Sequence, residues 1–186
     1  MFHVATRSVY ETFCFRDVDD RLDFLGIFNA VIDTYKWSCW SYCLMGTHYH
    51  LILQTPDPNL SDGMQMLNGR YAQRFNGRHG RRGHLFGERF CSVHIETESH
   101  LLAALRYVAL NPVEAGLCTS PTDWRWSSCR ATAGLEIAPR FLDVDGVLGL
   151  FALRRQAARA GFVRFVTDTP FEDTSADVVL ARMDGV

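Results

Sequence analysis

Lysine is nearly missing from this sequence: Lys36 is the only one among 186 residues, and the other basic side chains are arginines. Arginine suits planar, bidentate contacts with phosphate better than lysine does. No apolar run approaches the roughly 18 to 20 residues that span a bilayer, so we expect no membrane partner. The G-x-x-x-x-G-K-[ST] loop that binds ATP is also absent, so we expect a function that needs no ATP.

Six cysteines are present, but no C-x-x-C pair occurs among them. The usual spacing of a structural zinc site is therefore missing. The first residues read directly as a strand pattern rather than as a secretory signal. We therefore expect reduced thiols in a cytoplasmic protein. With 47% apolar residues, the chain has the size and composition of one compact domain with room for an appendage.

Positive charge is concentrated in one segment, although the formal net charge of the whole chain is only −2. Between residues 70 and 89, six arginines face a single acid, Glu88. Such a segment predicts contacts with the phosphates of a nucleic acid. The alternative is an ordinary solvated basic loop. The candidate nucleic-acid-binding residues are Arg70, Arg74, Arg78, Arg81, Arg82 and Arg89.

In some segments the apolar residues recur at every second position, and in others at about every 3.6 positions. These segments predict seven strands and helices. Strands are predicted over 2–10, 37–45, 48–55 and 91–95, and helices over 17–35, 60–75 and 99–112. Because Pro112 follows Asn111, the last of these helices is expected to end there. The order predicts an α+β fold, a ferredoxin-like βαββαβ antiparallel sheet with helices on one face, plus one more helix.

The last third of the chain has a different character. We expect residues 1–134 to form the main domain and residues 135–186 a C-terminal helical extension with an acidic tail. Two helices are predicted over 141–151 and 153–166, and the acidic segment 167–179 is expected to be loose.

Two histidines flank a tyrosine in the segment "THYH" at the start of a predicted strand. Residues two apart on a strand face the same side, so His48 and His50 share one face and Tyr49 points to the other. Two neutral imidazoles form half of a site for a divalent metal ion. The alternative is that both histidines are ordinary residues on a polar face.

A tyrosine and an asparagine lie four residues apart in the segment "LRYVALNP". Tyr107 and Asn111 therefore share one face of the predicted helix, about one turn apart. A tyrosine hydroxyl can act as a nucleophile, and a carboxamide oxygen can bind a hard cation such as Mg²⁺. The alternative is a core tyrosine followed by an asparagine that ends the helix.

Several separated motifs, in this order, resemble the single-tyrosine HUH transposases, and most of all the REP-associated tyrosine transposases. They are "CLMGTHYHLILQ" with the basic segment after it, "LLAALRYVALNPVEAGL" and "DWRWSSCRATAG". The resemblance covers residues 2–134 and implies a catalytic domain that acts on single-stranded DNA. It implies that His48 and His50 are the HUH histidines, that Tyr107 is the nucleophile, and that Asn111 is the polar residue one turn later.

The resulting hypothesis is an HUH-type single-tyrosine transposase that cleaves and rejoins single-stranded or hairpin DNA, as a monomer or a homodimer. His48, His50 and Asn111 would hold one Mg²⁺ or Mn²⁺ ion, which acts as a Lewis acid. Tyr107 would become linked to the 5′ phosphate. Two alternatives remain open: a catalytically silent DNA-binding regulator, and a hydrolytic nuclease in which water attacks and Tyr107 is structural.

Overall fold

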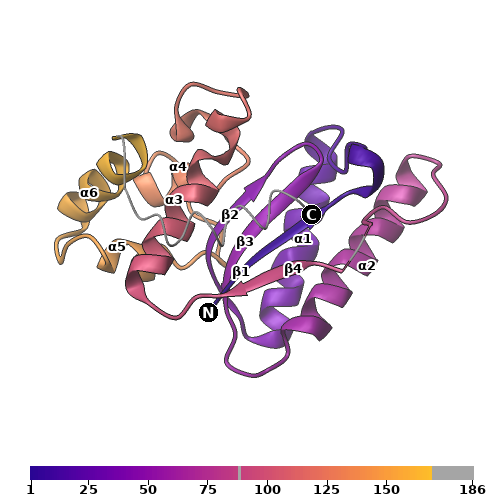
Figure 1. The fold of residues 1–186 in the computed structure, drawn as a ribbon, viewed down its shortest axis with the longest axis horizontal. Coiled ribbons are helices and arrows are strands. Elements are labelled where there is room, and N and C mark those ends of the chain that lie inside the picture. The colour runs from indigo at the N-terminus through magenta and orange to yellow at the C-terminus, as the bar shows by residue number, and fades with distance from the viewer. Residues whose placement is uncertain (88, 169–186) are drawn as a thin grey trace.

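The central feature of the computed structural model is a four-stranded antiparallel sheet (Figure 1). The structure describes residues 1–87 and 89–168. The strands are β1 (Phe2–Arg7), β2 (Ser38–Leu44), β3 (His48–Gln54) and β4 (Cys91–His94), in the order β2-β3-β1-β4. This order confirms the predicted ferredoxin-like arrangement. β1 is shorter than predicted, because the chain turns into a short 3-10 helix at Val9–Glu11.

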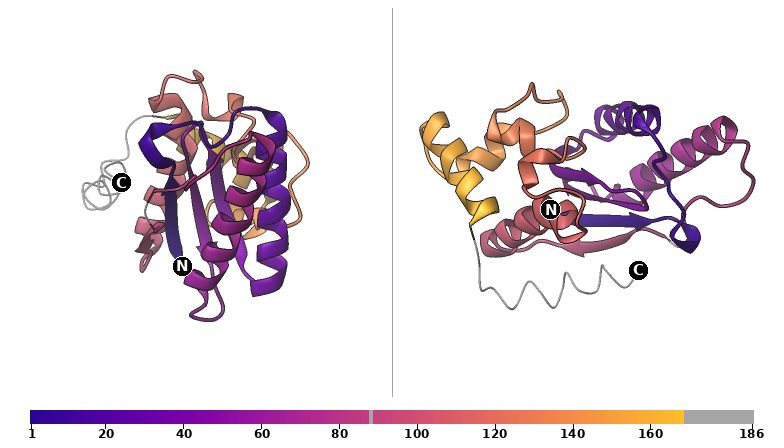
Figure 2. Two further views of the ribbon diagram at one scale, coloured as in Figure 1. Left: turned by 90° about the vertical axis from the view of Figure 1, so that its right-hand side faces the viewer. Right: turned by 90° about the horizontal axis from the view of Figure 1, so that it is seen from above.

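Helices cover both faces of the sheet (Figure 2). The two helices of the βαββαβ unit, α1 (Val18–Tyr35) and α2 (Leu60–Arg78), lie together on one face, as predicted. The additional helix α3 (Glu98–Glu114) covers the opposite face. Alternation along β3 explains this division. Tyr49 packs on Phe24 of α1, whereas His50 lies against Tyr107 of α3.

The expectation that α3 ends at Asn111 is wrong, because the helix continues through Pro112 to Glu114. A proline inside a helix cannot donate to the carbonyl four residues earlier, at a cost of about 3 kcal/mol. Pro112 is itself buried, and the backbone N–H of Ala115 still donates to the carbonyl of Asn111. Burial of Asn111 and Pro112 offsets the lost hydrogen bond. Asn111 precedes the proline, so its helical register with Tyr107 is not affected.

The C-terminal part contains the short 3-10 helix Pro121–Asp123 and three helices, α4 (Cys129–Ala133), α5 (Val144–Gly149) and α6 (Arg155–Thr167). Helices α5 and α6 confirm the two that were predicted there. Their apolar residues, such as Val147 and Phe162, belong to the same hydrophobic core as the sheet. Residues 169–186, which include most of the predicted acidic tail, lie outside the described residues.

One arginine connects the helix α3 to this C-terminal part. The guanidinium of Arg106 donates to the backbone carbonyls of Phe165 and Asp168, at and just beyond the end of α6. It also lies 5.7 Å from the centre of the Phe165 ring.

Two global properties complete the description. All six cysteines are free thiols, and four of them are buried. Across residues 1–87 and 89–168, no helix is both long and apolar enough to cross a membrane.

Candidate active site

The candidate site lies on the face of the sheet that α3 covers. His48 and His50 project from the first half of β3, where they pair with Arg7 and Ala5 of β1. Directly opposite residues of an antiparallel pair point to the same face. The small side chain of Ala5 packs against Ala103 of α3, and the half-buried ring of Tyr107 packs against this pair. The helix can therefore approach the histidines closely.

His48 and Asn111 contact each other directly. The Nε2 atom of His48 lies 3.2 Å from the Oδ1 atom of Asn111, although the two residues are 63 positions apart. The other ring nitrogen of His48 lies 3.2 Å from the hydroxyl oxygen of Thr47. Asn111 is buried, with 8% of its surface exposed. The structure therefore brings together two of the predicted metal ligands and fixes both of them.

Tyr107 lies beside the histidines on the same face. Its ring meets the ring of His50 edge-on, with 5.3 Å between the centres and an angle of 89°. Tyr49, the tyrosine between the two histidines, is fully buried on the other face, where its hydroxyl donates to Asn68. Of the tyrosines in the two motifs, Tyr107 is thus the one placed next to the imidazoles.

A third histidine, which the sequence analysis did not single out, completes this cluster. His3 of β1 is fully buried, and its Nε2 atom lies 3.2 Å from the Nδ1 atom of His50. Its ring also lies edge-on to Tyr107, 5.6 Å between centres. The available signal was the alternation of "FHVATR", which places His3 and Ala5 on one face of β1.

The environment keeps the buried imidazoles neutral. Burial lowers the pKa of His50 well below its ordinary value, and the nearby His3, His48 and Arg7 lower it further. Burial, with a smaller effect of His100, lowers the pKa of His3 to about 3. A neutral imidazole has one nitrogen with a free electron pair, which is the form that binds a metal ion.

The donor atoms of this site fit a divalent cation. The Nε2 atom of His50 is buried and has no hydrogen-bond partner within the described part of the chain. In the same part of the chain, no three His, Cys, Asp or Glu side chains are grouped to hold a metal. A third protein ligand would therefore be an oxygen such as that of Asn111. Imidazole nitrogens bind divalent transition metals, and a carboxamide oxygen binds hard cations such as Mg²⁺ and Mn²⁺, so this donor set fits a divalent cation.

The predicted DNA-binding arginines fall into two groups. Arg74 and Arg78 form ion pairs with α1: Arg74 with Asp23 at 2.7 Å, and Arg78 with Asp17 at 2.7 Å and with the buried Asp20. Arg81 is half-buried, and its guanidinium lies 5.9 Å from the centre of the Phe75 ring. Of the six predicted arginines, Arg70, Arg82 and Arg89 are exposed and have no carboxylate partner among the described residues.

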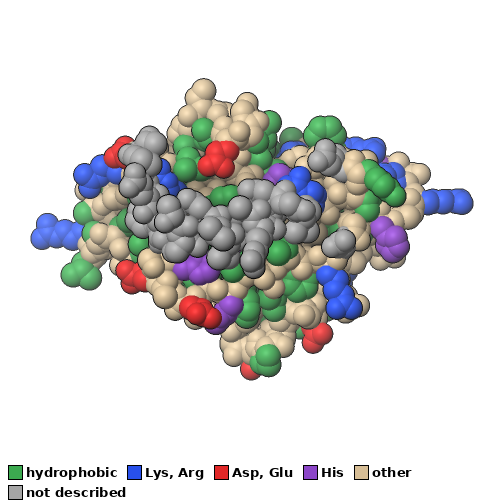
Figure 3. Space-filling model, viewed as in Figure 1, with side chains coloured by type: hydrophobic (Ala, Val, Ile, Leu, Met, Phe, Trp, Pro, Cys, Tyr) green, Lys and Arg blue, Asp and Glu red, His purple; other side chains and the backbone are tan. Residues whose placement is uncertain are grey.

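Figure 3 shows basic side chains at the end of the molecule formed by α2 and the loop after it. Arg82 and Arg89 belong to this loop. The loop is tied to the end of β1, since the N–H of Val9 donates to the carbonyl of Leu85 and the N–H of Gly87 to that of Arg7. Arg7 pairs with His48 in the sheet. Arg82 and Arg89 thus lie on a loop anchored next to the histidines.

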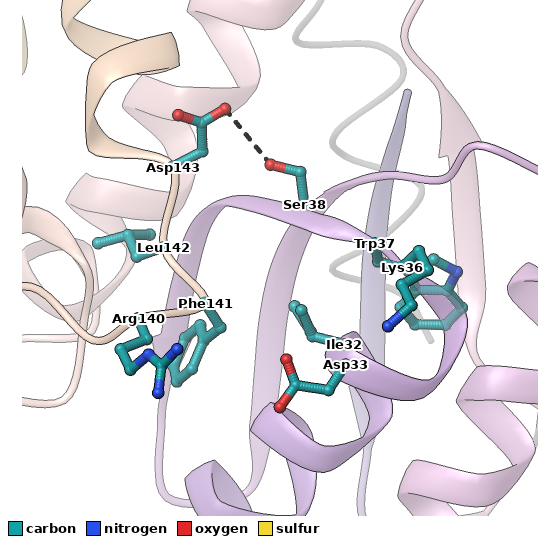
Figure 4. A pocket seen from close by; sticks show the side chains of 9 residues that line it. All are labelled: Ile32, Asp33, Lys36, Trp37, Ser38, Arg140, Phe141, Leu142 and Asp143. Carbon is teal, nitrogen blue, oxygen red and sulfur yellow. Dashed lines mark hydrogen bonds between the residues drawn. The ribbon is translucent and has the colours of Figure 1, made fainter.

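A separate pocket lies at the other end of the β2–β3 hairpin (Figure 4). Its lining includes Ser38, which pairs with the last residue of β3, whereas His48 is the first. Asp143 accepts a hydrogen bond from the Ser38 hydroxyl, and the basic side chains of Lys36 and Arg140 lie in the same lining. The pocket therefore shares no residue with the histidine cluster.

Comparisons with known proteins place this geometry in context. The family model described as "Transposase IS200 like" matches residues 1–111. No curated protein matches the sequence significantly. Among solved structures, a REP-associated tyrosine transposase bound to a REP hairpin is similar, with 14% identity, a TM-score of 0.62, and coverage of 74% of this chain and 81% of that one. A candidate transposase from Deinococcus radiodurans R1 has 15% identity, a TM-score of 0.42, and coverage of 62% and 88%.

Proposed function

Because this chain belongs to the IS200-like transposase family, we propose that it is a metal-dependent DNA strand transferase. It cleaves and rejoins single-stranded DNA through a covalent link between Tyr107 and a 5′ phosphate. The observation that carries this proposal is the meeting, within one chain, of the His48–Asn111 pair with Tyr107 and His50. A nucleophile and three metal-binding atoms from two distant segments are gathered in one place.

Tyr107 is the proposed nucleophile. Its hydroxyl oxygen attacks the phosphorus atom and loses its proton, while the bond from phosphorus to the 3′ oxygen breaks and that oxygen gains a proton. One phosphodiester bond is exchanged for another, so a second DNA 3′ hydroxyl can reverse the step and rejoin the strand. No ATP is consumed.

His48, His50 and Asn111 are the proposed metal ligands. A Mg²⁺ or Mn²⁺ ion bound there would polarise a non-bridging phosphate oxygen as a Lewis acid. Neutral imidazoles and a carboxamide add no negative charge to the site, so they do not repel the phosphodiester. His50 has only 2% of its surface exposed, so its ring is largely shielded from water.

Single-stranded or hairpin DNA is the proposed substrate. The similar solved transposase is described as bound to a REP hairpin, and this chain has its exposed Arg82 and Arg89 on the loop next to the histidines. Contacts from such arginines to phosphates are largely independent of sequence and sensitive to salt. Tyr107 lies against His50 of its own chain, which supports a site formed within one subunit.

The test is a covalent adduct. The purified protein is incubated with labelled hairpin DNA from the flanks of its own gene, in Mn²⁺ or in EDTA, and run on a denaturing gel. We expect a slower, labelled protein band that requires Mn²⁺ and disappears in Tyr107→Phe. Tyr35→Phe is the matched control, because Tyr35 is half-buried beside Trp37 at the end of α1. Its adduct should equal that of the wild type.

Two other results would change the conclusion. Cleavage without an adduct that survives Tyr107→Phe would identify a hydrolytic nuclease. Binding of hairpins without cleavage, over a panel of hairpins from both flanks, would identify a DNA-binding regulator.

A further inference from the structure

We propose that His3 is a positioning residue for the metal site: it accepts the Nδ1 proton of His50 and so keeps the Nε2 atom of His50 free to bind the ion. This inference rests on the proposed function, because it concerns the metal ligand that the function requires.

The contact between the two rings is short and protected from water. The Nε2 atom of His3 and the Nδ1 atom of His50 lie 3.2 Å apart, which is hydrogen-bond distance for two ring nitrogens. His3 has no exposed surface and His50 has 2%. A hydrogen bond between two ring nitrogens holds a single hydrogen, so only one of the two facing nitrogens carries it.

Two placements of that hydrogen have different consequences for metal binding. If Nδ1 of His50 is the donor, its Nε2 atom has a free electron pair. If Nε2 of His3 is the donor, His50 must instead carry its proton on Nε2, where it blocks a metal ion. A metal-binding His50 therefore requires His3 as the acceptor.

The remaining nitrogens are consistent with selection by a cation. The Nδ1 atom of His3 and the Nε2 atom of His50 are both buried without a hydrogen-bond partner among the described residues. Each placement of the shared hydrogen leaves one of these two atoms as an N–H without an acceptor. Both placements therefore leave the same number of buried N–H groups without an acceptor. A cation at Nε2 of His50 selects the placement in which Nδ1 of His50 is the donor.

Each of the two proposed imidazole ligands then has an outer hydrogen-bond partner at its Nδ1 atom. His48 has the hydroxyl of Thr47 at its Nδ1 atom, and His50 has His3 at the same position. Metal-binding histidines commonly donate their second ring N–H to such an outer partner, which fixes the tautomer and the orientation of the ring. His3 also borders Tyr107, so it contacts both the proposed nucleophile and the proposed ligand.

The test compares two substitutions of His3 in the full-length chain without DNA. His3→Phe fills the buried space but offers no acceptor, whereas His3→Gln offers a carbonyl oxygen at a similar distance from the backbone. We expect His3→Phe to weaken Mn²⁺ binding, measured by calorimetry, by about 10- to 100-fold. His3→Gln should remain within about 3-fold of the wild type.

A spectroscopic measurement separates positioning from packing. In the wild-type protein saturated with Mg²⁺, the ¹⁵N signal of Nδ1 in His50 should report a protonated, hydrogen-bonded nitrogen. In His3→Phe at saturating Mg²⁺ the signal should lose its hydrogen-bond shift, and His3→Gln should restore it. Thermal unfolding of both variants controls for loss of the fold, and if His3→Phe does not fold, His3→Leu replaces it.

The outcomes are distinguishable. If the wild type binds Mn²⁺ but His3→Phe binds it equally well, His3 is not a positioning residue. If His3→Gln binds as weakly as His3→Phe, the acceptor role is likewise excluded. If the wild type itself binds no Mn²⁺, the proposed metal-dependent function fails, and the inference about His3 fails with it.

Discussion

The Nε2 atom of His48 lies 3.2 Å from the Oδ1 atom of Asn111. This contact joins the first residue of β3 to the last turn of α3 across 63 positions of sequence. The Asn111 oxygen can only accept, so the Nε2–H of His48 donates to it, and a cation bound by both atoms would take the place of that hydrogen. The helix that provides Asn111 also carries Tyr107. The position of the proposed nucleophile relative to the histidines is thus set by the docking of a single helix.

Removal of the Asn111 oxygen should weaken metal binding. Loss of an outer-shell partner typically costs 10- to 100-fold in metal affinity, so for Asn111→Ala we expect a loss of at least about 10-fold in Mn²⁺ affinity and a comparable slowing of adduct formation. Asn111→Asp keeps an oxygen at this position and should retain the affinity. Titration of Mn²⁺ into each variant measures the effect, and unchanged binding by Asn111→Ala would remove Asn111 from the ligand set.

The exposed loop arginines should contribute to DNA binding through phosphates. Each phosphate contact to single-stranded DNA adds about 0.7 to the slope of log affinity against log salt. We therefore expect Arg82→Gln and Arg89→Gln each to weaken binding and to reduce that slope by about 0.7. Arg74→Gln is the control, since Arg74 is already paired with Asp23. Fluorescence anisotropy at several salt concentrations measures these slopes. A larger reduction of the slope in Arg74→Gln than in the loop variants would contradict the proposed phosphate contacts of Arg82 and Arg89.

The carboxylate of Asp17 should titrate far below its ordinary range. Its hydrogen bonds from Arg78, and next that from the backbone of Asp20, lower its pKa to about 2. A carboxylate with a depressed folded-state pKa favours the folded state above its unfolded pKa, and this contribution is lost as the pH falls through about 2. In Arg78→Gln the pKa of Asp17 should rise toward its ordinary value. An NMR titration of its carboxyl carbon measures this, and a pKa that stays near 2 would show that Arg78 is not the cause.

Two glycines of α2 should respond oppositely to substitution by alanine. A Cβ at Gly63 would lie 2.2 Å from the ring of Trp37, whereas a Cβ at Gly69 would meet nothing within 4 Å. Gly63→Ala should therefore destabilise the protein by about 1 to 3 kcal/mol through overpacking. Gly69→Ala should stabilise it by about 0.5 to 1 kcal/mol, since alanine is the better helix former. Urea unfolding measures the change in the free energy of unfolding of each variant. Changes of the same sign would contradict the packing of Trp37 on α2.

Local periodicity was sufficient to predict most of the fold. Alternation in β3 placed His48 and His50 on one face and Tyr49 on the other, and helical spacing placed Tyr107 one turn from Asn111. The role of His3 was not predictable in this way, because it depends on the register between β1 and β3, which brings Ala5 opposite His50. That register is a tertiary property that no single segment specifies.

The end of α3 shows the same limit of local rules. Pro112 is a local signal for a helix end, and burial of this end of the helix outweighs it. Arg78 is another case: its sequence neighbours do not show that Asp17 and the buried Asp20, at the start of α1, are its ion-pair partners. Local patterns predict elements and their faces, whereas packing between elements decides what each charged side chain meets.

Arg106 directly precedes Tyr107, and its guanidinium is bonded to backbone carbonyls at the end of α6. A slide of α3 along its own axis by one turn would move Tyr107 about 5.4 Å and would break both of these bonds. The C-terminal segment therefore helps to fix the position of α3, and with it Tyr107, along the sheet. A chain truncated after residue 134 would keep every proposed catalytic side chain but would lose the hydrogen bonds from Arg106 that help to position α3 relative to β3.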